Sequence, residues 1–428
     1  MCLIKMSAAE EQNNIPDIIP SNSWNFGTGR FVSNEENASV LIRYIWILIF
    51  AAALLTFFGL TMIYSASYGS EAMRYFKSQI FWICIGIAGG VTAYYTGYKN
   101  LIKWSPLMVA GVLILLVIAF FSKPVNGAHR WIFIRLPGIS MSLQPSEFAK
   151  LTMALYVSGY CSQNFRTLSV FFDRNGLWKV MAVSAVMLGA IVAGRDLGTT
   201  VLVALMIGLI LFAGGMPFRY ILLPLFLLTL AGVYIYFFDE MRLSRVVTFL
   251  DPQKYQKGGG YQLWTSLMAL GSGSWTGMGF LGSRFKAKYL PEQHTDFILS
   301  VVGEELGFLT LLFVVIGGYI IFVFSALKIS LNAKNKTGML LGFGITSFIA
   351  FQAIINMTVI AGLAPTKGMP APFISYGGSN MVVCLTSVGV LLSIGASSIN
   401  EDYNLAFLAG CRKIVSKILH RKNEELKD

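Results

Sequence analysis

The chain has 428 residues, of which 55% are hydrophobic and only 13% charged, and its mean hydropathy is +0.64. A soluble protein normally has about a quarter charged residues, so the composition excludes a soluble globular protein and predicts an integral membrane protein. The formal net charge of +12 does not indicate nucleic-acid binding, because the basic residues stand at the ends of apolar segments and not on a soluble domain.

Apolar stretches dominate the chain after a polar start. Residues 1–41 lack a basic segment followed by an apolar core, so we expect a disordered cytoplasmic tail and no cleaved signal. Ten stretches follow that are each close to the roughly 20 residues of a membrane-spanning helix: 43–65, 78–97, 105–122, 145–162, 177–194, 199–215, 219–238, 297–327, 338–361 and 380–398. They show no period-two alternation, which favours helices over barrel strands. The sequence predicts an all-α integral membrane fold, a polytopic bundle of ten transmembrane helices within residues 42–400.

The basic C-terminal tail, residues 401–428, sets the predicted orientation. Its lysines and arginines place it in the cytoplasm by the positive-inside rule, and an even number of spans brings the N-terminal tail to the same side. The long connection 239–296 is then extracytoplasmic. Connections longer than about 15 residues are usually functional or disordered, and we expect residues 261–270 to form a short amphipathic helix at the membrane interface.

Basic residues also fall on the outer face, against the positive-inside bias. They are Lys123, Arg130, Arg135, Arg195, Arg242, Arg245, Lys286, Lys288 and Lys367. Two explanations stay open: short outer loops tolerate a few cations, or some of these residues hold an anionic head group.

The first outer motif is "NGAHRWIFIRLPG", residues 126–138, in which Trp131 stands between Arg130 and Arg135. A tryptophan at this depth is more often a membrane-interface anchor than a ligand contact. Flanked by two guanidinium groups, which favour phosphate, it is also a candidate platform for a sugar or a lipid phosphate.

Charged residues stand inside two of the apolar spans. In "SLQPSEFAKL" Pro145 opens the fourth span, and Glu147 and Lys150 are i,i+3 neighbours that can neutralise each other. Lys150 can instead point into an outward cavity and contact an anion. Glu304 and Glu305 lie about 12–14 Å along the eighth span from its start, where acids form either a structural polar pair or part of an ion path.

Asp296 stands where the polar "YLPEQHTD" enters the eighth span, directly after His294 and Thr295. An aspartate at a helix start can cap the first free N–H groups. It can also act as a general base at the membrane surface, ionised at neutral pH if its pKa is near the ordinary value of about 3.9. Beside it, His294 is a candidate substrate contact.

The segment "APTKGMPAPFISYGGSN", residues 364–380, joins the last two spans and is rich in proline and glycine. Irregular backbone at membrane depth is tolerated only where it is buried in protein or lines a cavity. A re-entrant loop that presents Lys367, Ser375, Tyr376 and Ser379 to a polar substrate therefore fits better than a plain connector.

Several common chemistries are absent from the sequence. The five cysteines are odd in number and lack a CxxC pair, and the three histidines are far apart. There is no P-loop, serine-hydrolase elbow or HExxH motif. A hard cation held between a carboxylate and a phosphate stays open.

The motifs "NGAHRWI", "QPSEFAKL", "YQLWTSLMALGSGSWTGMGFLG", "LPEQHTDFILSVVGEELG" and "PTKGMPAPFISYGGSN" occur in this order. Together they resemble the SEDS family (shape, elongation, division and sporulation proteins) across about residues 40–400. "PTKG" with "SYGGS" resembles the cell-division branch more than the elongation branch. The resemblance implies ten transmembrane helices and a peptidoglycan glycosyltransferase that polymerises lipid II. It also implies the bacterial cytoplasmic membrane at the division septum, a class B penicillin-binding transpeptidase and other divisome proteins as partners.

The resemblance also implies roles for single residues. Asp296 matches the family's essential outer aspartate and Trp131 its functionally sensitive tryptophan, while Lys150 and Lys367 match basic positions of its cavity and last outer loop. The lipid II leaving group is a diphosphate that needs no protein acid if Arg245, Lys367 or a divalent Mg²⁺ or Mn²⁺ stabilises it. One carboxylate then suffices to activate the acceptor 4-hydroxyl, and direct attack inverts the α-linked donor to a β-1,4 product.

Two other functions stay open. A lipid II flippase would also suit polar residues within spans four and eight, and a divisome scaffold would recruit the transpeptidase.

Three positions depart from the family pattern. Arg195 stands where proline is expected, so the turn after the fifth span is expected to differ; Lys288 replaces an acid of some members, which weakens a metal site there; and Asn380 replaces serine, with little effect expected.

Overall fold

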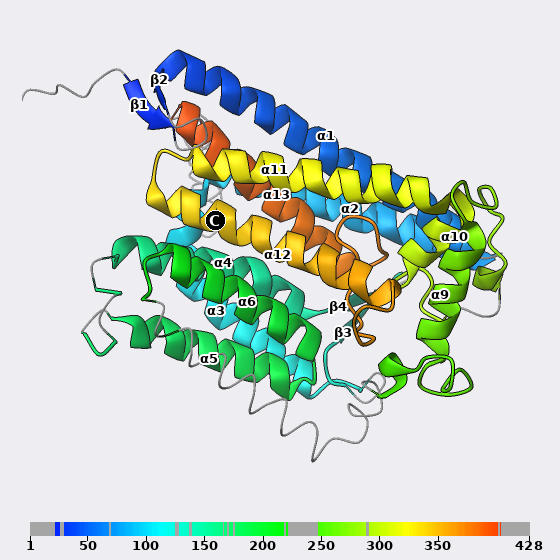
Figure 1. The fold of residues 1–428 in the computed structure, drawn as a ribbon. Helices are drawn as coiled ribbons and strands as arrows, with labels where there is room; N and C mark the ends of the chain where they lie inside the picture. Colours follow the sequence, from blue (N-terminus) through cyan, green and yellow to red (C-terminus); the bar gives the residue numbers. More distant parts are fainter. Residues whose placement is uncertain are drawn as a thin grey trace, which may run out of the picture.

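The structure is a computed structural model that describes residues 22–25, 30–67, 70–124, 128–136, 139–165, 167–168, 171–173, 176–217, 220, 247–287, 291–400 and 403. Helices dominate this part of the chain (Figure 1). They are α1 (Asn34–Ala66), α2 (Ser70–Thr96), α3 (Tyr98–Phe120), α4 (Pro145–Gln163), α5 (Leu177–Ala193), α6 (Leu197–Ala213), α9 (Tyr261–Gly273), α10 (Ile298–Thr310), the π-helix η3 (Leu311–Ile316), α11 (Gly317–Leu331), α12 (Lys336–Ile360) and α13 (Gly378–Ile399). A short 3₁₀-helix, η2, covers Phe285–Ala287.

Every predicted span falls on a helix except 219–238, which lies outside the described residues. Six helical segments of the described part are long and apolar enough to cross a membrane: Ala38–Ala66, Met73–Thr96, Tyr98–Phe120, Ile298–Leu331, Lys336–Ile360 and Gly378–Ile399. Helices α5 and α6 are apolar but shorter. The polytopic helical membrane fold is confirmed, whereas the number ten stays a prediction.

Helix α4 is the least apolar of the predicted spans, and its position explains why. Pro145 occupies its first turn, where the missing N–H costs no hydrogen bond. The helix packs against α3, α6, α12 and α13, so protein rather than lipid covers most of its side chains. Polar residues such as Ser158, which is buried, can therefore stand along it.

Two small antiparallel sheets flank the bundle, β1 (Asn22–Asn25) with β2 (Arg30–Ser33) and β3 (Ile132–Leu136) with β4 (Ile139–Leu143). The first lies within the segment that we expected to be disordered, and α1 already begins at Asn34. In that sheet Trp24 is paired with Phe31, and aromatic residues favour strands. In Figure 1 this sheet lies at the opposite end of the bundle from α9, α10 and the loop after α12.

The eighth predicted span is not one continuous helix, which corrects the sequence prediction. Gly307 breaks α10 with φ 79° and ψ 175°, a conformation that glycine adopts without a steric penalty. The helix resumes through the π-helix η3 before α11. A π-helix inside an α-helix is rare and frequently marks a functional region.

The loop after α9 supplies the hydrogen bonds that this break would otherwise leave unmade. Met278 and Gly279 donate their N–H groups to the carbonyls of Glu304 and Glu305, at 3.0 and 2.9 Å. In return, Phe308 donates its N–H to the carbonyl of Ser274 at 3.0 Å. A Cβ at Gly307 would come within 2.4 Å of the loop backbone, so the close contact requires glycine. The loop, α9 and α10 are thereby joined into one hydrogen-bonded unit, and the short helix expected at 261–270 is confirmed.

Candidate active site

Asp296 lies just before α10, half-buried at the end of the bundle that carries α9. Its carbonyl accepts a hydrogen bond from Nδ2 of Asn356 in α12 at 2.8 Å. A Cβ at Gly368 would lie 3.1 Å from its Oδ2, so the carboxylate rests against the loop between α12 and α13. The N-cap of α10 is Phe297, without a side-chain cap. The capping alternative for Asp296 is therefore wrong, and no residue of the described ranges donates a hydrogen bond to its carboxylate.

The surroundings of this carboxyl group change its acidity. Burial raises the pKa of Asp296 most, Glu292 raises it further, Arg130 lowers it and Asp196 raises it, and the resulting pKa is about 7. This pKa lies above the ordinary value on which ionisation at neutral pH was made conditional, because loss of water disfavours the charged form. A pKa near neutral pH suits a general base, which must be deprotonated and still hold a transferred proton.

Asp196 is a second aspartate of this region, and sequence reasoning did not select it. It is 3% exposed and caps α6 by accepting the N–H of Thr199 on Oδ1 at 3.3 Å. Its Oδ2 accepts hydrogen bonds from Nε2 of Gln144 at 2.8 Å and Oγ of Ser146 at 2.7 Å. Nη1 of Arg130 lies 3.8 Å from Oδ1. The aspartate before "LGTT" is a helix-start signal, but its link to Arg130 depends on tertiary structure.

Arg195 lies in the turn after α5, which we expected to differ from the family pattern. Its φ is 63°, in the left-handed region. Proline has φ fixed near about −65° and cannot adopt this conformation, so the turn here suits arginine and not the proline of the family pattern.

Of the motif around Trp131, the structure relates Arg130 to Asp296 and leaves the place of Arg135 relative to the site open. The carbonyl of Trp131 accepts a hydrogen bond from Oγ of Ser122 at 2.6 Å, and its half-buried side chain follows Arg130 in the chain. Arg135 lies in β3, where its backbone is opposite Ser140, and the position of its side chain is not described. Arg245 lies outside the described residues.

The loop between α12 and α13 is buried against both helices, as expected for a re-entrant segment. Nε2 of Gln352 donates to the carbonyl of Pro370 at 2.7 Å and to Oδ1 of Asn380 at 2.9 Å. Nδ2 of Asn356 donates to the carbonyl of Met369 at 2.8 Å. Asn380, expected to matter little, thus helps to fix Gln352.

Lys367 belongs to the same loop and is half-buried one residue before the contact with Asp296. Burial lowers the pKa of its ammonium group. No carboxylate among the described residues pairs with it. Lys367 and Arg130 are thus the cations that the structure brings toward the Asp296 region.

The other predicted contacts of this loop have partners within the protein. Oγ of Ser375 accepts the N–H of Ala371 at 2.8 Å, and Oγ of Ser379 accepts the N–H of Gln144 at 2.9 Å. The hydroxyl of Tyr376 lies 3.1 Å from that of Ser78. These side chains fix the loop to its surroundings, and their contact with a substrate stays a prediction.

His294 stacks with aromatic residues from two other elements. Its ring centroid lies 4.2 Å from that of Tyr75 in α2 and 5.8 Å from that of Tyr376. The carbonyl of His294 accepts the N–H of Tyr376 at 2.9 Å. These contacts fix the segment that carries Asp296, and sequence reasoning missed Tyr75.

Lys150 is 1% exposed and lies inside the bundle. Its Nζ donates to Oε2 of Glu147 at 2.6 Å and to Oε1 of Gln352 at 2.7 Å. Of the two alternatives from the sequence, mutual neutralisation is the one observed in this conformation. A contact of Lys150 with substrate stays a prediction.

Glu304 binds the loop that follows α9. It is fully buried, and its Oε1 accepts the N–H groups of Arg284 at 2.6 Å and Phe285 at 3.3 Å. The hydroxyl of Ser283 donates to its Oε2. Each carboxylate oxygen therefore has a donor.

Glu305 is equally buried and joins three parts of the chain. Its Oε1 accepts from Nζ of Lys286 at 2.7 Å and the N–H of Ser283 at 3.3 Å. Its Oε2 accepts from Oγ of Ser65 in α1 at 2.5 Å and from the N–H of Leu281 at 3.2 Å. The two glutamates form a structural polar pair, and Lys286, one of the cations that we expected on the outer face, neutralises Glu305.

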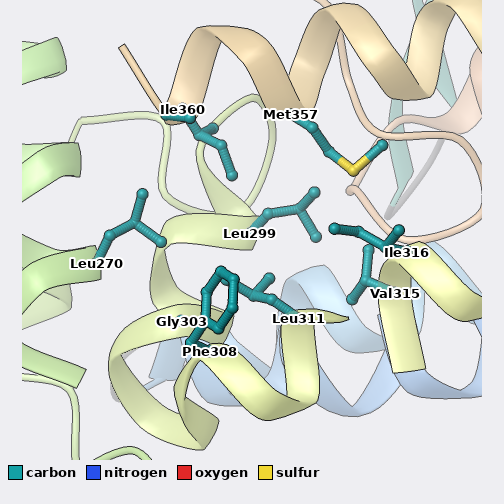
Figure 2. Close-up of a pocket in the computed structure, with 10 residues that line it drawn as sticks. Leu270, Leu299, Gly303, Phe308, Leu311, Val315, Ile316, Met357 and Ile360 are labelled. Carbon is teal, nitrogen blue, oxygen red and sulfur yellow. The ribbon is translucent and has the colours of Figure 1, made fainter. Parts of the chain in front are cut away.

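An apolar cavity of about 190 Å³ lies between α9, α10, η3 and α12 (Figure 2). Leu270, Leu299, Phe308 and Met357 are among the side chains that point into it. With no titratable side chain in its lining, it is not the site of the chemistry expected from the sequence.

The described residues contain no group of three or more His, Cys, Asp or Glu side chains that could hold a metal ion. We therefore assign no residue to a metal, and the Mg²⁺ or Mn²⁺ considered from the sequence stays a prediction.

Comparison with known proteins decides the family. The model of the FtsW, RodA and SpoVE family, described as cell cycle protein, matches residues 42–400. The chain belongs to the FtsW/RodA/SpoVE family. The SEDS resemblance carried by the motifs is thereby confirmed.

Relatives within the FtsW/RodA/SpoVE family are similar over most of their length. A probable peptidoglycan glycosyltransferase FtsW of Geobacter sp. strain M18 is 35% identical over 361 residues, which are 82% of this chain and 96% of the relative. One of Trichlorobacter lovleyi is 36% identical over 368 residues, 83% of this chain and 94% of the relative.

Solved structures share the fold. A chain of a peptidoglycan synthase complex that coordinates polymerization and crosslinking has a TM-score of 0.69 at 21% identity, covering 83% of this chain and 98% of that chain. RodA of Thermus thermophilus has a TM-score of 0.61 at 21% identity, covering 82% and 97%.

Proposed function

We propose that this protein is a peptidoglycan glycosyltransferase that polymerises lipid II into β-1,4 glycan strands, with Asp296 as the general base. The observation that carries the proposal is the Asp296 carboxylate. It is half-buried, its pKa is about 7, and no described residue donates a hydrogen bond to it. The names of the FtsW relatives and the fold shared with a chain of a peptidoglycan synthase complex support the same reaction.

The proposed reaction uses Asp296 for one proton transfer. Its carboxylate takes the proton of the acceptor sugar's 4-hydroxyl while that oxygen bonds to the anomeric carbon of the donor. The bond from that carbon to the diphosphate breaks, and the diphosphate leaves with the electron pair. Arg130 and Lys367 stabilise this anion, since fixed cations in a site with little water act strongly on developing charge.

The cellular setting belongs to the same proposal. The protein acts in the bacterial cytoplasmic (inner) membrane at the division septum, with both tails in the cytoplasm and Asp296 on the outer side. Its partner is a class B penicillin-binding transpeptidase, which crosslinks the strands. The orientation rests on the basic tail at residues 401–428.

A flippase is less well supported than an enzyme. Export of a polar head group would require polar groups along a path through the bundle. The buried charged residues of α4 and α10 are instead paired within the protein: Lys150 with Glu147, and Glu305 with Lys286 of the loop after α9.

The deciding experiment supplies labelled lipid II in detergent, where no flipping is needed, to the purified protein together with its transpeptidase partner. We expect polymer from the wild type and none from Asp296→Asn. Equal polymer from both would refute the role of Asp296. Absence of polymer from both, with lipid II exchange across vesicles, would establish the flippase instead. Absence of both activities, with stimulation of the transpeptidase, would identify a scaffold.

A further inference from the structure

Arg130 interacts with two aspartates that come from separate parts of the chain. Asp196 is at the start of α6 and Asp296 precedes α10, whereas Arg130 follows α3. Nη1 of Arg130 is 3.8 Å from Oδ1 of Asp196. Arg130 is also the cation that lowers the pKa of Asp296. One guanidinium group therefore acts on both carboxylates.

The two carboxylates differ in what already binds them. Both oxygens of Asp196 accept hydrogen bonds, from Thr199 on one and from Gln144 and Ser146 on the other. These hydrogen bonds fix the position of the Asp196 carboxylate. The carboxylate of Asp296 has no such donors within the described ranges, so a guanidinium group in reach would bind it unless another anion held that group.

Arg130 has donors to spare. Its Nε is buried and makes no hydrogen bond within the described residues, and 27% of its side chain is exposed. A guanidinium group carries five N–H donors in a planar fork that matches the oxygens of a phosphate. Held by Asp196 along one edge, it can offer its remaining donors to an anion beside Asp296.

We propose that Asp196 is a positioning residue that keeps the Arg130 guanidinium away from the Asp296 carboxylate and directs its free donors to the donor substrate's diphosphate. This inference rests on the proposed function. Without Asp196, Arg130 would pair with Asp296, which would occupy the base and withdraw a cation from the leaving group.

The charged groups that shift the pKa of Asp296 are Glu292 on its own segment, Arg130 after α3 and Asp196 at the start of α6. Lys367 precedes Gly368, the residue of the loop before α13 that packs against the carboxylate. Removal of the negative charge of Asp196 favours ionisation of Asp296, and release of Arg130 favours it further. Removal of Arg130 has the opposite effect.

The first test titrates the Asp296 carboxyl group directly, by infrared difference spectroscopy of the full-length protein with Asp296→Asn as the blank. We expect Asp196→Asn to lower the pKa of Asp296 and Arg130→Gln to raise it, each by about half a unit or more. Asp251, which accepts the N–H of Lys254 at 3.1 Å, provides the control. Asp251→Asn also weakens a capping bond, and it should leave the titration unchanged. Shifts of the same sign in both site variants would overturn the inference.

The second test measures lipid II polymerisation by the complex with its transpeptidase. Asp196→Asn and Arg130→Gln should each lower kcat by about 10-fold to 100-fold, and the double variant should be no slower than Arg130→Gln alone. Losses that multiply would show that Asp196 acts only on the fold. Thermal unfolding of each variant identifies misfolded protein. If Asp196→Asn fails to fold, comparison of Arg130→Gln with Arg130→Lys still tests the role of the cation, because only lysine should restore part of the rate.

The two tests separate this inference from the proposed function. An inactive wild type with opposite pKa shifts would refute the glycosyltransferase and retain the positioning of Arg130. An active wild type with shifts of one sign would refute the positioning and retain the glycosyltransferase.

Discussion

Two regions at the same end of the bundle treat buried carboxylates in opposite ways. Around Glu304 and Glu305 every carboxylate oxygen has a donor, from loop N–H groups, hydroxyls or Lys286. Around Asp296 the described residues supply cations nearby but no hydrogen bond to the carboxylate. A saturated carboxylate joins chain segments and has no capacity for chemistry, whereas an unsaturated one is available to a substrate.

The largest loss of activity is expected on replacement of Asp296. Replacement by Asn keeps the shape and removes the base, so we expect polymerisation to fall by about 10³-fold or more, within the range known for loss of general base catalysis. The melting temperature should hardly change, because no hydrogen bond to the carboxylate is lost. The measurement is gel analysis of labelled glycan strands together with thermal unfolding. A large loss of stability would show that Asp296 is structural after all.

Changes around Glu304 and Glu305 should lower the stability of the protein rather than its activity. Lys286→Met leaves the buried Glu305 without its cation, and such a loss costs about 3–5 kcal/mol of unfolding free energy. We expect a clear fall in melting temperature, with loss of activity only as the protein unfolds. Lys254→Met is the matched control, since Lys254 is exposed on the same long connection. Equal melting temperatures for Lys286→Met and Lys254→Met would show that the ion pair of Lys286 and Glu305 does not stabilise the loop.

A smaller effect is expected at Lys367, which we propose stabilises the leaving diphosphate and takes no part in proton transfer. Lys367→Gln removes a half-buried cation that no described carboxylate neutralises, so stabilisation of the leaving diphosphate should weaken and kcat should fall about tenfold or more. The kinetic assay with lipid II measures it, and Lys257→Gln, an exposed lysine of the long connection, is the control. Equal kcat values for Lys367→Gln and the control would exclude Lys367 from the reaction.

The helices, and the place of Asp296 just before the eighth span, could be predicted from the sequence because hydropathy and local polarity are local properties. The environment of Asp296 could not, since Gly368 and Arg130 reach it only through tertiary packing. For the same reason Glu305 was placed in a span correctly while its partners, Lys286 and Ser65, were not foreseen.

The break of the eighth span was missed on similar grounds. Gly307 looks like any glycine of an apolar run, and only the loop that fits against it makes its positive φ favourable. Hydropathy therefore gave the span but not its interruption. Asp196 was missed because a helix-start aspartate is common, and its contact with Arg130 appears only in the folded chain.

The smallest predicted effect tests the cause of the raised pKa of Asp296. Proton transfer needs the ionised carboxylate, so kcat/KM should rise with pH through about 7, the pKa of Asp296, and not near its ordinary value. Glu292 raises that pKa by like charge, although burial contributes more. Glu292→Gln should therefore move the acid limb of the kcat/KM profile to lower pH by a fraction of a unit and leave kcat at high pH unchanged.

The sign of this shift distinguishes the two causes. If Glu292 served mainly to hold the segment through its contact with Thr295, at 2.9 Å, Glu292→Gln would lower kcat at every pH without moving the limb. Thr295→Val removes that contact and keeps the charge, so it should leave the acid limb in place. A shift in Glu292→Gln alone assigns the effect to charge, and the remaining elevation of the pKa then belongs to burial. Glu304 and Glu305 are also buried, so what sets Asp296 apart from them is that no described residue donates a hydrogen bond to its carboxylate.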